Sequence, residues 1–281
     1  MNARGSLLAL IKYHVVACIS TVRWRFVPPV YLLALMSFIV DKRRNVWWNL
    51  MPLGDDANVW DVAQWFLNNV FYDGFLILLG FALLVEDDIV RGHKDGTLRS
   101  TLLLSRSTLR WWCAKILSMG VLALAYMSIV FVAILVASLV MGIPMGFHDS
   151  GASIRLADIP IQHRWYTLPA GWSTVAYTAF AVFSLTFTMW VIAVVHQALS
   201  LFVFPSRRIP FFVFFAWLLA GFMIQPAGGA WWDVRWLLYP GKCFAEYGRG
   251  SISIPVFFGV MTTALVGAAA AGYRRLRRMD F

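Results

Sequence analysis

Six apolar stretches dominate this chain, and most of them reach the length that a helix needs to cross a lipid bilayer. They cover residues 26–40, 62–85, 111–143, 172–204, 210–224 and 254–273. A transmembrane helix takes about 20 predominantly apolar residues. Hydrophobic residues form 60% of the chain and charged residues only 14%, which lies outside the usual range of soluble domains. The sequence therefore predicts an all-α integral membrane protein with six transmembrane helices.

The first apolar stretch is the weakest of the six because it holds only 15 residues. Pro28 and Pro29 fit the start of its helix, where missing N–H groups cost little. To span the bilayer, the stretch must borrow length from Val22 or from residues 46–48, or the bilayer must thin locally. Residues 1–25 have apolar residues near helical spacing, and we interpret them as a helix lying in the inner interface. The alternative is one long kinked helix that joins both segments.

Lysine and arginine fall mainly on one side of the predicted spans. With the N-terminus in the cytoplasm, cytoplasmic segments hold 16 of the 24 basic residues, although Lys42, Arg43 and Arg44 fall on the other side. Because cytoplasmic loops carry an excess of positive charge, both termini are expected in the cytoplasm. This bias and attraction to anionic lipids explain the net charge of +10, so no nucleic acid partner is expected. The 16 residues are Arg4, Lys12, Arg23, Arg25, Arg91, Lys94, Arg99, Arg106, Arg110, Lys115, Arg207, Arg208, Arg274, Arg275, Arg277 and Arg278.

The segment before the last span has an intermediate polarity. Residues 231–253 are too polar to cross a bilayer and too apolar to lie free in water, and Pro240 followed by Gly241 interrupts them. We expect two short re-entrant helices that dip into the outer leaflet. Three scattered cysteines, Cys18, Cys113 and Cys243, offer neither a disulfide framework nor the spacing of a metal site.

The densest run of charge lies between the second and third apolar stretches, within residues 86–115. Asp95 and Gly96 predict a turn, and Thr97 is expected to cap a short helix through its hydroxyl. Leu98 and Leu102 then fall on one face of that helix. The pattern predicts a compact cytoplasmic protrusion with leucines on one side and charges on the other, the alternative being an ordinary charged loop.

The order of residues in this region follows a recognisable pattern. An acidic residue after the second span is followed by Gly-Thr-Leu, a leucine pair, a small polar residue, and a lysine that leads into the third span. The matching positions are Glu86, with Asp87 beside it, Gly96, Thr97, Leu98, Leu102, Leu103, Ser107 and Lys115. This pattern resembles the coupling region, here residues 86–110, of type-2 ATP-binding-cassette exporter permeases. The chain differs from that family at Ser105-Arg106, where proline is often found, and at Thr101, where an apolar residue is expected.

The resemblance implies that residues 1–281 form a single transmembrane domain of an ATP-driven exporter in a bacterial cytoplasmic membrane. Because no Gly-x-x-x-x-Gly-Lys-Ser/Thr loop occurs, the chain is expected not to be an enzyme and to need no cofactor of its own. A separate cytoplasmic ATPase subunit would bind ATP and Mg, and a second permease copy, identical or different, would complete the path. An amphipathic lipid, peptide or antibiotic-like compound is the expected cargo. The residues expected to couple the ATPase to the spans are Glu86, Asp87, Gly96, Thr97, Leu98, Leu102, Leu103 and Lys115.

Polar residues within the apolar stretches keep a second class of protein open. Asn69 and Asp73 lie in the second stretch, and His196 lies in the fourth. Ionisable groups in hydrocarbon are costly, so they either bond to neighbouring helices or line a translocation path. A proton-coupled secondary transporter or channel would use Asp73 and His196 as a titrating pair and would need no ATPase.

Overall fold

The computed structural model describes residues 6–44, 57–67, 76–85, 89, 92, 95–146, 172–202, 212–213, 215–216 and 253–279. In these ranges the regular structure is helical and no strand occurs. Four of the described helices are long and apolar enough to cross a membrane: α2 (Val22–Arg44), α7 (Thr108–Val140), α9 (Thr174–Phe202) and α12 (Ile254–Arg277). The predicted helical class is confirmed, and the apolar helices agree with a protein embedded in a membrane.

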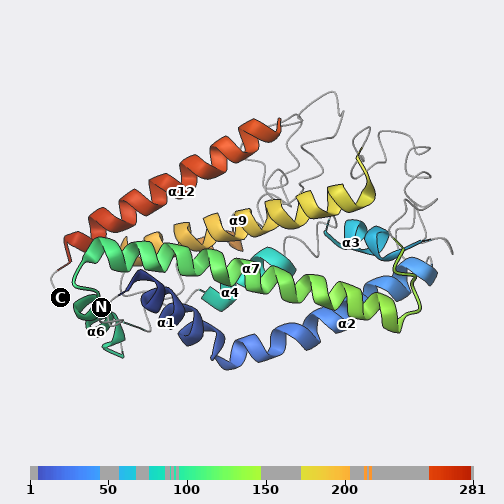
Figure 1. Ribbon diagram of the computed structural model, residues 1–281, viewed down its shortest axis with the longest axis horizontal. Coiled ribbons are helices and arrows are strands. Elements are labelled where there is room, and N and C mark those ends of the chain that lie inside the picture. Colours follow the sequence, from blue (N-terminus) through green and yellow to red (C-terminus); the bar gives the residue numbers. More distant parts are fainter. Residues whose placement is uncertain are drawn as a thin grey trace.

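The long helices pack around α7, with α12 lying along α9 (Figure 1). Trp190 of α9 donates its indole N–H to the Ile116 carbonyl of α7 at 2.8 Å. Near the ends of α9 and α12, Arg275 Nε donates to the Leu201 carbonyl at 3.2 Å. Near their starts, the rings of Phe180 and Phe258 lie 6.4 Å apart. The helices α9 and α12 are therefore parallel, and both are antiparallel to α7.

One end of the bundle gathers segments that are far apart in the sequence. The start of α1 (Leu7–Ile19), the short helix α6 (Thr97–Ser105), the start of α7 and the end of α12 all lie there (Figure 1). We call this the α6 end and the opposite one the distal end. The sequence predicts that these same segments share the cytoplasmic side of the membrane, and their common placement is what that orientation requires.

The helices α1 and α2 are separate, since Ser20 and Thr21 interrupt them. The helix α2 begins six residues before Pro28, so the prediction that Pro28 and Pro29 start it is wrong. Tertiary packing explains the difference, because Trp24 and Val27 are buried in the core. In addition, Arg23 Nη1 donates to the Leu83 carbonyl at 2.8 Å, which holds the turn that precedes the prolines. The span thus takes its extra length from Val22, one of the two sources expected.

The predicted second span, residues 62–85, is described in two pieces at opposite ends of the bundle. The helix α3 (Val59–Leu67) lies at the distal end, where the Val59 N–H donates to the Pro144 carbonyl beyond the end of α7 at 3.1 Å. The helix α4 (Leu79–Val85) lies toward the α6 end, and Gln197 Nε2 donates to its Val85 carbonyl at 2.7 Å. Residues 76–78, just before α4, form a π-helical turn.

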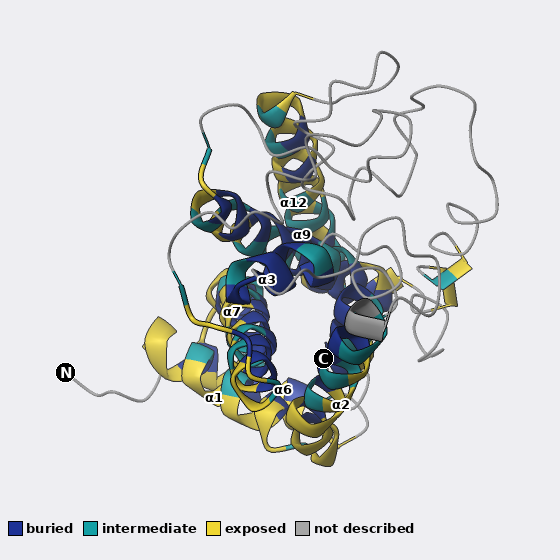
Figure 2. Ribbon diagram, turned by 90° about the vertical axis from the view of Figure 1, so that its right-hand side faces the viewer, coloured by how far each residue is buried: buried dark blue, intermediate teal, exposed yellow. Residues whose placement is uncertain are grey.

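The core is built from aromatic and aliphatic side chains of α2, α3, α4, α7 and α9. Viewed along the bundle, buried residues line the inner sides of the helices and exposed residues lie on the outer sides of α1 and α2 (Figure 2). The exposed faces are themselves apolar, as at Leu33, Leu124 and Val260, which suits contact with lipid. The predicted fifth span, residues 210–224, lies mostly outside the described residues, and the re-entrant segment 231–252 lies entirely outside them.

Candidate functional site

Two left-handed turns delimit α6, the short helix that protrudes at the α6 end. Gly96 precedes it with φ 70°, and Arg106 follows it with φ 56°. Glycine adopts this conformation at little cost, whereas a residue with a Cβ is strained in it. Ser107 then caps α7 and accepts a hydrogen bond from the Arg110 N–H at 3.3 Å. The predicted turn at residues 95–96 is confirmed, and α6 meets α7 through a tight connection.

Thr97 does not cap α6 as predicted. Gly96 occupies the N-cap position, and no side chain caps the helix there. Thr97 is already the first helical residue, so its hydroxyl points back into the preceding loop and donates to the Gly92 carbonyl at 3.2 Å. The prediction of the short helix is correct, but its cap was placed one residue too late.

The inner face of α6 attaches it to the bundle. Leu98 is only 3% exposed and belongs to a buried cluster that includes Trp111 of α7 and Leu276 of α12, and Leu102 packs against the same cluster. Trp111 Nε1 donates to the Thr101 hydroxyl at 3.0 Å. Thr101, the polar residue at a position where an apolar one is expected, therefore accepts the hydrogen bond that joins α7 to α6. Leu98 and Leu102 do share a face, as predicted, but that face is the attachment and not a free surface.

The outer face of α6 consists of Arg99, Ser100, Leu103 and Leu104, which are four residues apart in pairs and all exposed. Leu103 is 71% exposed and Leu104 is 64% exposed. These two adjacent leucines form a small exposed apolar patch on the outer face of α6. Of the leucines expected to couple, Leu103 is the one that this arrangement leaves available to another protein.

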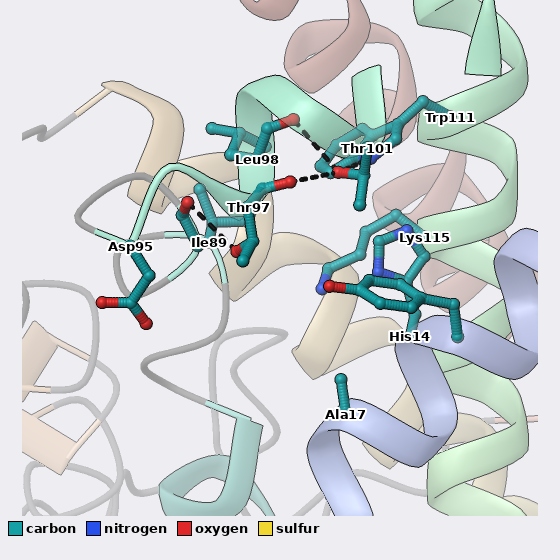
Figure 3. A pocket seen from close by; sticks show the side chains of 11 residues that line it. His14, Ala17, Ile89, Asp95, Thr97, Leu98, Thr101, Trp111 and Lys115 are labelled. Carbon is teal, nitrogen blue, oxygen red and sulfur yellow. Dashed lines mark hydrogen bonds between the residues drawn. The ribbon is translucent and has the colours of Figure 1, made fainter. Parts of the chain in front are cut away.

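A cavity of about 170 Å³ lies in the joint between α1, α6 and α7 (Figure 3). Lys115 and His14 line it although they are only 2% and 5% exposed. The His14 ring packs edge-on against Trp111, with ring centroids 5.4 Å apart. Thr97 and Asp95 border the cavity from α6 and from the loop before it, and the Asp95 carboxylate points away from the Lys115 side chain in Figure 3. Lys115, predicted at the start of the third span, therefore lies in the joint behind α6.

The remaining predicted site residues are only partly placed. Glu86, Asp87, Asn69 and Asp73 lie outside the described residues. His196 is 3% exposed and lies in α9 near the α6 end. The pairing of Asp73 with His196 thus stays a prediction. Within the described ranges, no group of three or more His, Cys, Asp or Glu side chains is arranged to hold a metal ion.

Sequence reasoning missed the residues that fix α6 in place. His14, Thr101 and Trp111 come from three helices, and no spacing along the chain connects them. Comparison with known proteins adds no further constraint, since no protein-family model matches the sequence and no curated protein is similar to it.

Proposed function

We propose that the chain is the membrane-spanning permease subunit of a type-2 ATP-binding-cassette exporter, with α6 as the docking element for a separate cytoplasmic ATPase. The observation that carries the proposal is the division of α6 into two faces. Leu98 and Thr101 bind it to the bundle, while Leu103 and Leu104 remain exposed. A protrusion that is attached on one side and presents two exposed leucines on the other has the form needed to receive force from a partner protein.

The proposed topology has six spans in a bacterial cytoplasmic membrane, with both termini in the cytoplasm. In this arrangement α2 is the first span, α3 and α4 belong to the second, and α7, α9 and α12 are the third, fourth and sixth. The parallel direction of α9 and α12 supports it, because the chain leaves α9 at the α6 end and enters α12 at the distal end. An odd number of crossings between them, such as the fifth span at residues 210–224, satisfies that direction.

The attachment of α6 suggests how a displacement of this helix would be transmitted to the spans. The buried cluster behind Leu98 contains residues of α7, α9 and α12, so displacement of α6 bears directly on the α6 ends of three spans. Closure of the ATPase on ATP and Mg would move this end as a unit and switch the spans between two packings. A second permease copy would provide the other half of the path, and an amphipathic compound suits its apolar walls.

The test pairs two exposed leucines at the same end of the bundle. The tagged chain is co-expressed with a candidate ATP-binding-cassette ATPase, such as one found in a neighbouring reading frame, and the purified material is assayed for ATPase content and ATP hydrolysis. Leu103→Ser is expected to lower ATPase capture strongly, whereas Leu8→Ser, at a leucine of α1 that is 75% exposed, leaves it unchanged. The secondary transporter would be established instead by two results together. The unmodified chain captures no ATPase, and its transport follows the proton gradient and is lost in Asp73→Asn.

A further inference from the structure

Two tyrosine hydroxyls converge on one backbone carbonyl inside the membrane-embedded bundle. Tyr31 of α2 donates to the Leu76 carbonyl at 2.8 Å, and the Tyr126 hydroxyl of α7 lies 3.2 Å from the same oxygen. The two hydroxyls are 2.6 Å apart, and both side chains are at most 2% exposed. Leu76 is one of the described π-helical residues, 76–78, that precede α4. A π turn inserts an extra residue and so displaces carbonyls from their regular partners, and inside a bilayer these must be satisfied by other protein groups.

A glycine brings α4 close to this pair. A Cβ on Gly80 would lie 2.6 Å from the Tyr126 hydroxyl oxygen, which is closer than side-chain carbons approach such an atom. The rings of Phe81 and Trp24 enclose Tyr126, with centroids 5.3 and 6.1 Å away. The absence of a side chain at position 80 is therefore what allows the hydroxyl pair to reach the backbone of the π turn.

The opposite end of α4 is bonded to three other helices. The Leu83 carbonyl accepts from Arg23 of α2, the Leu84 carbonyl from the Cys18 thiol of α1 at 3.8 Å, and the Val85 carbonyl from Gln197 of α9 at 2.7 Å. The last carbonyls of a helix have no partners within the helix itself. Side chains supply those partners here, so α4 is held at both ends by hydrogen bonds from neighbouring helices.

We propose that Tyr31 and Tyr126 form a releasable latch on the second span. In the observed packing their hydroxyls bond to the Leu76 carbonyl within the π-helical residues. When the pair separates, residues 76–78 are free to adopt α-helical bonding, in which the Gly80 N–H donates to the Leu76 carbonyl, and their register relative to α4 changes by one residue. A one-residue change corresponds to about 100° of helix rotation. The span thereby has two discrete arrangements, which is the property that a conformational switch requires.

Hydrogen exchange of the full chain in lipid nanodiscs tests the latch without any partner. Interhelical hydrogen bonds in membranes contribute about 0.6 to 1.7 kcal/mol. Tyr126→Phe and Tyr31→Phe are therefore expected to speed exchange of residues 76–85 by roughly three- to twentyfold. Tyr177→Phe, at a fully buried tyrosine of α9, serves as the control and leaves these residues unchanged. Unchanged exchange in both latch variants, or an equal rise across all helices, overturns the proposal.

A steric rescue provides a second and independent readout. Gly80→Ala places a methyl group against the Tyr126 hydroxyl and is expected to raise exchange of residues 76–85 as well. The ring carbon that bears this hydroxyl would lie 3.9 Å from that methyl group, an ordinary contact distance. Combining Gly80→Ala with Tyr126→Phe should therefore add nothing to the effect of Tyr126→Phe alone. Fully additive effects contradict the latch.

The role of the latch in export rests on the proposed function, but the latch itself does not. In the complex with the ATPase, Tyr126→Phe is expected to retain ATPase capture while substrate-stimulated ATP hydrolysis falls severalfold. Failure of the unmodified chain to capture an ATPase counts against the proposed function only. Normal capture together with unaltered stimulation in Tyr126→Phe counts against the role of the latch in export, whereas the exchange of residues 76–85 decides the latch itself.

Discussion

Replacing Thr101 by valine should loosen α6 from the bundle without unfolding the protein. Valine keeps the shape of threonine but removes the oxygen that accepts the Trp111 indole N–H at 3.0 Å. Both residues are buried, with Trp111 2% exposed and Thr101 6% exposed, so water does not readily replace the lost partner. A buried donor left without an acceptor costs about 1–3 kcal/mol. That range corresponds to roughly 5- to 150-fold in the equilibrium between attached and detached α6.

Hydrogen exchange of residues 97–105, followed in the full chain in nanodiscs, measures this equilibrium. Thr178→Val is the matched control, because Thr178 is also buried but donates to the Thr174 carbonyl of its own helix at 2.9 Å. A bond of that kind adds little stability to a helix, so the control should leave α6 unchanged. In the double variant Thr101→Val with Trp111→Phe, no donor remains to be orphaned. Its effect should be smaller than the sum of the two single effects.

Exchange of residues 97–105 that stays at the unmodified rate in Thr101→Val means that the hydroxyl does not hold α6. Strict additivity of the two substitutions means that the indole and the hydroxyl do not act on each other.

Three further predictions concern packing and backbone strain. Gly272→Ala places a methyl group 2.8 Å from the Trp112 Cη2 atom. Thermal unfolding should show that this variant is less stable than the unmodified protein by about 1–3 kcal/mol. Gly267→Ala is the control and should not lower the stability, because a methyl group there meets nothing within 4 Å. Arg106→Gly relieves the strain of the left-handed backbone at the end of α6. It should slow hydrogen exchange at that end by an amount equivalent to about 1 kcal/mol. Faster exchange would contradict the presence of strain at Arg106. Gln197→Leu leaves the Val85 carbonyl at the end of α4 without the side chain that donates to it. The free energy of unfolding in detergent should fall by about 1 kcal/mol. Leu199→Ala, at an exposed position of the same helix, is the control and should not cause this loss.

The sequence predicts the long helices well because their apolar length is a strong local property. The stretches 111–143, 172–204 and 254–273 correspond to α7, α9 and α12 within a few residues at most ends. The start of α2 is less predictable. Proline chemistry favours a helix that begins at Pro28, but the burial of Trp24 and the bond from Arg23 extend it back to Val22. Contacts with other helices decide that boundary, and the local sequence does not contain them.

The candidate site shows the same division between local and long-range information. Helical periodicity places Leu98 and Leu102 on one face of α6, but it does not reveal which face binds the bundle. That choice depends on Trp111, which lies in the next helix, and on Leu276, which is far from α6 in the sequence. The pair Tyr31 and Tyr126 is separated by 95 positions, and neither residue stands out in an apolar helix rich in aromatic side chains.

The central claim is that an ATPase binds the outer face of α6, and site-specific photo-crosslinking tests it most directly. A photoreactive amino acid is introduced in place of Leu103 in one variant and in place of Leu98 in another, and each is illuminated in the presence of the co-expressed ATPase. A crosslink to the ATPase is expected from position 103, where the side chain is 71% exposed, and none from position 98, where it is 3% exposed. Crosslinks from neither position, or from position 98 alone in a folded protein, would contradict the central claim.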